Sequence, residues 1–395
     1  MDSSKTFKTQ LYTSTFAILC LSQMLFAASF TMIIPELPEH LRQMGGEDYI
    51  GLIIGLFTLT AGISRPFSGK LTDTIGRIPV QIIGTFVCVV ASLIYPFVSS
   101  VFAFLLLRLF HGFSTGFKPT ATTAYTADIV PFDRRGEAMG ILGVSMNTGA
   151  SIAPPIGSYL ADIYSINTMF YTSSIVALIS VLMLLTMKET LKNKQSFHPK
   201  ILVLKKNDLY DRSALLPSSL ALLFYMALGA LITIGPDQSV YFGLKNKGLF
   251  MASFTAFSIL SRLMTGSLSD RIGRINVLRV SIILIVFSLV SLSLVNSANM
   301  FLMACGCMGF AIGTASPPVF AWTIDRCLDE NRGRALATIY IALEISIGFG
   351  AIFSAWLYNS NPDKFGMVFL ILAIISTIGL FIMRPSNVKK VVRHN

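Results

Sequence analysis

The sequence carries little charge for its length. Lys, Arg, Asp and Glu make up 13% of the 395 residues, whereas a soluble domain carries about 25% of them. Hydrophobic residues reach 53% and lie in blocks of about 20, the length that takes a helix across ~30 Å of hydrocarbon. The shortage of charge therefore excludes an ordinary soluble enzyme and indicates a multi-pass membrane protein.

Other absences narrow the function. The five cysteines, four of them inside apolar blocks, show neither a disulfide framework nor the spacing of a metal site. The sequence also lacks a nucleotide-binding P-loop, a His-Glu-x-x-His metalloprotease motif and a Gly-x-Ser-x-Gly nucleophile elbow. We therefore expect no enzyme activity, no cofactor and no metal, and any work done by the protein should draw on an ion gradient.

Twelve apolar blocks predict an all-α membrane protein with twelve transmembrane helices. They cover residues 12–34, 49–69, 80–98, 101–126, 137–161, 167–187, 214–236, 248–268, 276–296, 299–323, 334–358 and 364–383. The longest polar stretch, 189–213, separates six blocks from six. It predicts an N-terminal bundle over 1–188, a cytoplasmic linker over 189–213 and a C-terminal bundle over 214–395.

The basic residues predict the orientation. Formal net charge is +11, and 23 of the 31 Lys and Arg lie at the N-terminus, in the even-numbered turns or in the C-terminal tail, against four in the odd-numbered turns. Because cytoplasmic loops carry the excess of Lys and Arg, both termini are expected in the cytoplasm, with the protein in a bacterial inner membrane. The excess of positive charge therefore indicates how the protein is oriented in the lipid bilayer and does not indicate binding to nucleic acid.

The two halves repeat each other at an offset of 197 residues. Residues 64–77 align with 261–274 without a gap, and Asp128 and Arg135 fall on Asp325 and Arg332. Six spans separate the copies, so both have the same orientation. Parallel six-helix halves around an axis along the membrane normal are a known transporter plan, with the binding site at midplane between them.

The repeated turns predict a conformational latch between the bundles on the cytoplasmic side. Asp73 and Arg77 are four residues apart and can pair on one helical turn, while Gly69 and Gly76 allow a sharp bend. The predicted latch residues are Gly69, Asp73, Gly76, Arg77, Asp128 and Arg135 in the first half, and Gly266, Asp270, Gly273, Arg274, Asp325 and Arg332 in the second.

These motifs resemble those of the major facilitator superfamily. The Gly69 to Arg77 turn resembles its loop 2–3 signature, the segment 107–112 its fourth-span motif with a buried arginine, and 149–158 the fifth-span motif of proton-coupled drug exporters, with Ala153 and Ser158 in place of two glycines. The resemblance implies two pseudo-symmetric six-helix bundles, secondary transport by alternating access and a monomer. It is nearest to the proton-coupled drug and metabolite exporters, although Thr31 stands where relatives often carry a first-span acid.

A polar stripe runs along the fourth block. On a helix, Arg108, His111, Thr115, Lys118, Thr122 and Tyr125 fall within about 100° of arc. Lipid cannot cover such a stripe, so it must line a water-filled cavity or another helix. For Arg108 the alternative is a fixed contact with backbone carbonyls of the first span, and for His111 it is an interhelical hydrogen bond.

Glu344, a lone acid in the eleventh block, is the predicted proton carrier, with His111 as a second candidate. The alternative for Glu344 is a static pair with Lys118 or Arg108. The residues assigned to the substrate cavity are Gln23, Thr31, Arg108, Thr115, Lys118, Thr122, Tyr125, Asn147, Ser151 and Tyr340.

The combined pattern predicts a proton-coupled exporter, an antiporter of small organic molecules whose partners are the substrate, protons and lipid. One alternative is a symporter or exchanger for a small anionic metabolite, which Arg108 and Lys118 would suit. The other is a membrane receptor or scaffold that transports nothing, against which the repeated turns argue.

Overall fold

The computed structural model describes residues 12–131, 134–203, 210–265, 268–327 and 332–383. Within these ranges the chain is helical and contains no strand, and twelve helices have 17 residues or more. In the first half these are α1 (Ser14–Met32), α3 (Ile50–Thr74), α4 (Arg77–Ile94), α5 (Val101–Ile129), α6 (Arg135–Ile163) and α7 (Ile166–Leu185). In the second half they are α8 (Leu215–Tyr241), α9 (Leu249–Thr265), α11 (Arg274–Ser293), α12 (Ala298–Arg326), α13 (Arg332–Tyr358) and α14 (Phe365–Ile382).

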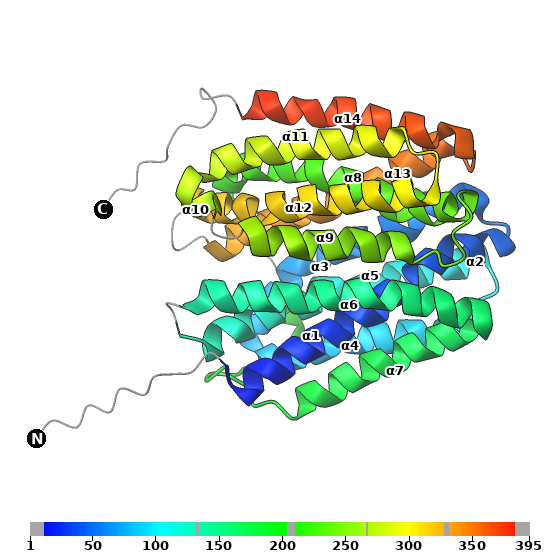
Figure 1. The fold of residues 1–395 in the computed structure, drawn as a ribbon. Coiled ribbons are helices and arrows are strands. Elements are labelled where there is room, and N and C mark those ends of the chain that lie inside the picture. The colour runs from blue at the N-terminus through cyan, green and yellow to red at the C-terminus, as the bar shows by residue number, and fades with distance from the viewer. Residues whose placement is uncertain (1–11, 132–133, 204–209, 266–267, 328–331, 384–395) are drawn as a thin grey trace, which may run out of the picture.

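Two short helices complete the described fold. Helix α2 (Leu37–Gln43) follows α1 through the single 3-10 turn Ile34–Glu36, and α10 (Leu268–Ile272) lies between α9 and α11. In Figure 1, α10 lies at one end of the molecule, together with the start of α1 and the end of α14, and α2 lies at the other. These two ends are called the α10 end and the α2 end below.

Nine helical segments of the described chain are long and apolar enough to cross a membrane. Helix α9 is apolar but shorter, and α5 and α6 are not among the nine. Their mean hydropathy is lowered by buried polar residues, such as Arg108 and Lys118 on α5. The all-helical membrane fold is confirmed, while the count of twelve crossings stays a prediction.

Local signals begin and interrupt the helices as their chemistry requires. The side chains of Thr13, Ser100 and Ser165 accept hydrogen bonds from backbone N–H groups in the first turns of α1, α5 and α7, which satisfies donors that have no partner within the helix. Prolines lie inside five helices, for example Pro66 in α3 and Pro119 in α5. Neighbouring helices in a membrane protein can satisfy the carbonyls that such prolines free.

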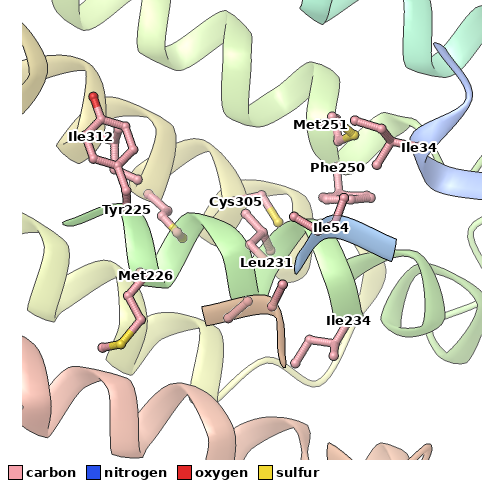
Figure 2. Packing of buried hydrophobic residues seen from close by; sticks show 14 of the residues in the cluster. Ile34, Ile54, Tyr225, Met226, Leu231, Ile234, Phe250, Met251, Cys305 and Ile312 are labelled. Atoms are coloured by element: carbon pink, nitrogen blue, oxygen red, sulfur yellow. The ribbon is translucent and has the colours of Figure 1, made fainter. Parts of the chain in front are cut away.

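The helices of each half pack mainly on one another. Helix α1 packs on α6 and α7, α3 and α4 pack on α5, and in the second half α8 packs on α13 while α12 packs on α9 and α11. The halves meet along two seams, α3 against α13 and α6 against α9. Figure 2 shows the buried cluster in which Ile34 and Ile54 of the first half lie near Phe250 and Met251 of α9.

The predicted repeat is visible in the packing. A Cβ at Gly112 of α5 would lie 2.1 Å from the Phe57 carbonyl oxygen of α3. A Cβ at Gly309 of α12 would lie 1.9 Å from the Phe254 carbonyl oxygen of α9. Both pairs are separated by the same 197 residues, so α5 approaches α3 as α12 approaches α9, and only glycine permits backbones to pack this closely.

Candidate functional site

A buried ion pair joins the two halves at the α3–α13 seam. The Arg65 Nη2 of α3 lies 2.6 Å from Glu344 Oε1 of α13, and the two side chains are only 8% and 7% exposed. The Arg65 guanidinium also lies 4.4 Å from the centre of the Tyr340 ring, one turn before Glu344. The partner of Glu344 is therefore Arg65, and the alternative that paired it with Lys118 or Arg108 is wrong.

A cavity of about 630 Å³ opens beside this pair. Arg65 and Asp73 of α3, Pro119 and Thr123 of α5, and Tyr340 of α13 are among the residues that line it. Both halves of the chain thus contribute to its wall. Because Asp73 lies in the last turn of α3, the cavity lies toward the α10 end.

Ion pairs between the halves lie at the α2 end. Arg42 of α2 donates to both carboxylate oxygens of Asp237 in α8, with Nη1 2.9 Å from Oδ1. Lys247, between α8 and α9, lies 2.9 Å from Glu36 Oε2, and Ser158 donates to the other oxygen of Glu36 at 2.7 Å. Ion pairs therefore join the halves at the α2 end, where a further hollow of about 640 Å³ lies between α3, α8 and α13. The hollow beside the Arg65–Glu344 pair lies toward the α10 end.

Arg108 and His111 lie inside the N-terminal bundle. The Arg108 Nε donates to the Ile53 carbonyl of α3 at 2.8 Å, and its Nη1 donates to the Tyr95 hydroxyl at 3.3 Å. His111 contacts Cys88 Sγ through Nε2 at 3.3 Å and Tyr95 through Nδ1 at 3.4 Å. The carbonyl partner of Arg108 thus belongs to α3 and not to the first span. His111 makes contacts between helices, as its alternative to a proton-carrying role expected.

The rest of the α5 stripe faces the same interior. Lys118 Nζ donates to Ser22 Oγ of α1 at 2.7 Å, and the Lys118 side chain is fully buried. No carboxylate of the described residues forms an ion pair with it. The structure gives these hydrogen bonds to other residues that were assigned to the substrate cavity: Thr122 to Gln81 (2.9 Å) and Gln23 (3.4 Å), Tyr125 to the Lys188 carbonyl (2.8 Å), Thr115 to the Gly112 carbonyl (3.3 Å) and Thr31 to the Ala27 carbonyl (2.7 Å). The stripe therefore lines other helices of its own bundle, and the cavity is lined by another face of α5.

Asn147 and Ser151 lie at the second seam. Ser151 of α6 donates to the Ala252 carbonyl of α9 at 3.3 Å. The amide nitrogen of Asn147 is buried and has no hydrogen-bond partner among the described residues. Of the residues predicted to form the cavity, Tyr340 alone lines the 630 Å³ hollow described above.

Comparison with known families decides the class. The model of the Major Facilitator Superfamily matches residues 19–327 and, in a second match, 218–394. The chain belongs to the major facilitator superfamily. It is accordingly a multi-pass membrane transporter, and the family resemblance drawn from the motifs is confirmed.

Relatives in the superfamily support this at modest identity. An uncharacterized transporter of Methanocaldococcus jannaschii is 26% identical over 367 residues, covering 87% of this chain and 92% of the relative. The multidrug resistance protein MdtG of Salmonella arizonae is 26% identical over 362 residues, covering 83% and 88%. Multidrug resistance protein 2 of Bacillus subtilis is 31% identical over 175 residues, 43% of this chain and 44% of the relative.

Solved structures show the same fold. The crystal structure of the human organic anion transporter MFSD10 has a TM-score of 0.73 at 18% identity and covers 94% of this chain and 99% of its own. The nucleoside transporter NupG has a TM-score of 0.74 at 14% identity, with 95% and 100% covered. At such identities the likeness shows the superfamily fold alone.

The superfamily's loop 2–3 turn has the predicted Asp73–Arg77 contact, within one half of the chain. The contact joins the end of α3 to the start of α4 and does not lie on one helical turn, and Gly69 lies inside α3 and not at the bend. Arg77 pairs with Asp73 at 2.9 Å and with Asp128, at the end of α5, at 3.1 Å. Gly76 has φ +125°, a conformation that favours glycine, whereas a Cβ at Gly69 would meet nothing within 4 Å. The cluster ties α3, α4 and α5 together and does not reach the C-terminal bundle in this structure.

The second copy follows the same plan where it is described. Arg274 pairs with Asp325 at the end of α12, and Gly273 has φ +90°. Gly266 lies outside the described residues, as do the side chains of Asp270 and Arg332. In the first copy, Arg135 donates to the Ala127 carbonyl at 2.7 Å.

Glu189 completes the first turn cluster and was not predicted from the sequence. Its carboxylate accepts from the backbone N–H groups of Arg77 and Ile78 at 3.0 Å each, at the beginning of α4. Burial alone would raise the pKa of this carboxyl, but N–H donors from Leu191, Arg77, Ile78 and Thr190 outweigh burial and hold the pKa below its usual value. The sequence Lys-Glu-Thr after a span does not by itself predict this role for Glu189. The contact with the beginning of α4 depends on tertiary packing, because the first residue of α4 is 112 residues away in the sequence.

Proposed function

We propose that this transporter is a proton-coupled antiporter that exports small organic molecules by alternating access. The observation that carries the proposal is the buried Arg65–Glu344 pair, which joins the two bundles beside a cavity lined by Arg65. A carboxyl at a moving seam can exchange its arginine partner for a proton, and intramembrane acids commonly serve in proton relays. The multidrug resistance proteins among the relatives support export.

Glu344 would couple the proton to the motion. When ionised, its carboxylate pairs with the guanidinium of Arg65 across the seam. When protonated, the Glu344 carboxyl no longer attracts that charge, and the guanidinium keeps only its contact with the Tyr340 ring. The balance between the two bundle arrangements then depends on the proton and on what occupies the cavity. His111 is kept as a second candidate, although its contacts lie within one bundle.

The proposed orientation places the α10 end in the cytoplasm, in agreement with the excess of Lys and Arg in its turns. The structure would then be the inward-facing state of a monomer. In the outward-facing state the Arg42–Asp237 and Glu36–Lys247 pairs must separate, and the turn clusters around Arg77 and Arg274 would approach the opposite bundle. The latch predicted from the sequence is proposed for that state.

Proteoliposomes with an imposed pH gradient test the function. A lipophilic organic cation and an aromatic carboxylate are added in separate runs. A transported compound should release protons from the wild-type vesicles, and Glu344→Gln should abolish the release while the protein still folds. Asp363→Asn, which removes an exposed acid in the α13–α14 turn, is the matched control and should keep the response. Proton release that persists in Glu344→Gln would refute its role, and exchange of labelled organic anions without proton movement would favour the anion-exchange alternative.

A further inference from the structure

The α3–α13 and α6–α9 seams occupy equivalent positions in the repeat, but they carry different charges. The 197-residue offset carries Arg65 of α3 onto Arg262 of α9, and it carries Asn147 of α6 onto Glu344 of α13. The first seam therefore holds an arginine opposite a carboxylate, while the second holds an arginine opposite a helix with a neutral amide. The packing of the two seams is otherwise alike. A Cβ at Gly51 would lie 3.0 Å from the Ala351 carbonyl oxygen of α13, and a Cβ at Gly248, the repeat position of Gly51, would lie 2.3 Å from the carbonyl oxygen of Pro154 in α6, the repeat position of Ala351.

Arg262 has no counter-charge in the described structure. Its Nη2 reaches only Ser316 Oγ of α12, at 3.4 Å, and no carboxylate of the described residues lies within 4.0 Å of it. Its Nε is buried without a hydrogen-bond partner among the described residues, as is the Nε of Arg65. Arg65, by comparison, has both a carboxylate and a covering ring, so the two arginines differ in what neutralises them.

The α6 side of this seam brings its backbone, and no aromatic ring, to the guanidinium. Gly143 occupies the repeat position of Tyr340, so no ring covers Arg262. A Cβ at Gly143 would lie 3.4 Å from Arg262 Nη1, so the α6 backbone passes close to the guanidinium. Asn147 follows one turn later on the same face, and its buried amide nitrogen also lacks an acceptor.

The groups around this position are donors that lack an acceptor. Arg262 and Asn147 contribute unpaired N–H groups, and the Ser316 hydroxyl, which is 2.8 Å from the Tyr225 hydroxyl, can donate or accept. An arginine without a partner inside a membrane protein is costly, and an unpaired buried donor adds to that cost. An oxyanion would satisfy the charge and both sets of N–H groups at once.

We propose that Arg262, Asn147 and Ser316 bind an oxyanion of the transported molecule, a carboxylate or a phosphate on a small organic compound. The ligand's anionic group would take, at the α6–α9 seam, the place that Glu344 takes at the α3–α13 seam. As a substrate site this rests on the proposed transport function, but the binding itself can be measured without transport.

The binding test uses purified full-length protein in detergent, in chloride-free buffer. Sodium benzoate and phenyl phosphate serve as oxyanion probes, and benzamide serves as the neutral probe of the same shape. An oxyanion should raise the thermal unfolding midpoint more than benzamide does, and Arg262→Gln should weaken its binding by about ten- to a hundredfold. Arg134→Gln, which removes a cation whose side chain is 37% exposed at the start of α6, should leave binding unchanged.

A second variant keeps the proposal falsifiable if Arg262→Gln does not fold. Asn147→Glu introduces the acid that the other seam carries, so it should raise the unfolding midpoint without ligand and abolish the preference for oxyanions. Equal shifts with benzamide and both anions, or an anion preference that survives either substitution, would overturn the proposal. Anion binding in a protein that moves no substrate would instead leave this site intact and refute the transport function.

Discussion

Replacing Glu344 by Gln tests the coupling between charge and conformation. Gln keeps an oxygen that can accept from Arg65, so the substitution removes the charge and not the shape. Hydrogen bonds to charged groups contribute about 1.5–3 kcal/mol, and both side chains are less than a tenth exposed, so little of this is screened by water. We expect a loss of about 2 kcal/mol at the seam, or roughly a 30-fold shift between the two bundle arrangements.

Spin-label distances across the α10 end can measure this shift. Labels at Thr186, which follows the last residue of α7, and at Ile272 of α10, both exposed, report the separation of the halves once the native cysteines are replaced. The distance distribution of Glu344→Gln should change, and pH should no longer alter it. A distribution identical to the wild type and equally sensitive to pH would refute the reasoning.

The double variant Arg65→Gln with Glu344→Gln separates stability from coupling. Breaking one member of a buried pair leaves an uncompensated charge, whereas replacing both leaves none. The double variant should therefore be more stable than Glu344→Gln alone, yet it should still fail to couple transport to protons. Recovery of proton coupling in the double variant would show that another group carries the proton.

Three further predictions follow from the packing and the turns. Gly112→Ala should lower the free energy of unfolding by about 1–3 kcal/mol, because its Cβ would lie 2.1 Å from a carbonyl oxygen of α3, whereas Gly69→Ala meets nothing within 4 Å and should be neutral in the same thermal unfolding assay. Arg42→Gln should weaken the closure at the α2 end by leaving Asp237 without its partner, seen as faster labelling of a cysteine introduced there. Glu189→Gln should lower the free energy of unfolding by about 1 kcal/mol at neutral pH. Because the pKa of this carboxyl is lower in the folded protein, its contribution to stability is present above the unfolded pKa of about 4.3 and is lost as pH falls through the folded pKa. The unfolding midpoints of the variant and the wild type should therefore converge in acid.

Each of these has a clear contrary result. Equal effects of the two glycine substitutions would show that the close approach of α5 to α3 does not limit stability. Unchanged labelling in Arg42→Gln would show that the α2 end is held shut by apolar packing alone. A constant difference between Glu189→Gln and the wild type across the acid range would show that the carboxylate acts through its shape and not through its charge.

Sequence periodicity predicted the helices and the repeated turns well, because these depend on local chemistry. The expected Asp73–Arg77 contact is present at 2.9 Å, but it joins the last turn of α3 to the first residue of α4, because Gly76 with φ +125° separates the two helices. Helix ends were less accurate. Helix α3 continues to Thr74, past the expected end at residue 69. The apolar block ends where Lys70 and Asp73 begin the polar part of the helix, but polar residues at the end of a bundle do not end a helix.

The contacts between helices could not be predicted in the same way. Arg65 and Glu344 are 279 residues apart, and their meeting depends on how α3 and α13 are rotated about their axes. A polar stripe shows only that Lys118 and its neighbours avoid lipid; it does not distinguish a cavity from a bundle interior. The repeat does show that Asn147 occupies the position equivalent to Glu344, so the difference in charge between the two seams can be read from the sequence.

The glycine contacts also limit which parts of the molecule can move. Because the α3 and α5 backbones touch at Gly112, and those of α9 and α12 touch at Gly309, neither couple can slide without steric collision. Each couple must therefore travel as a single stiff block. The seams have close glycine contacts of their own, at Gly51 against α13 and at Gly248 against α6, and these contacts must open when a block moves against a helix of the other half. Ligands that wedge into these meeting lines, and not into the blocks, should be the ones that arrest the cycle.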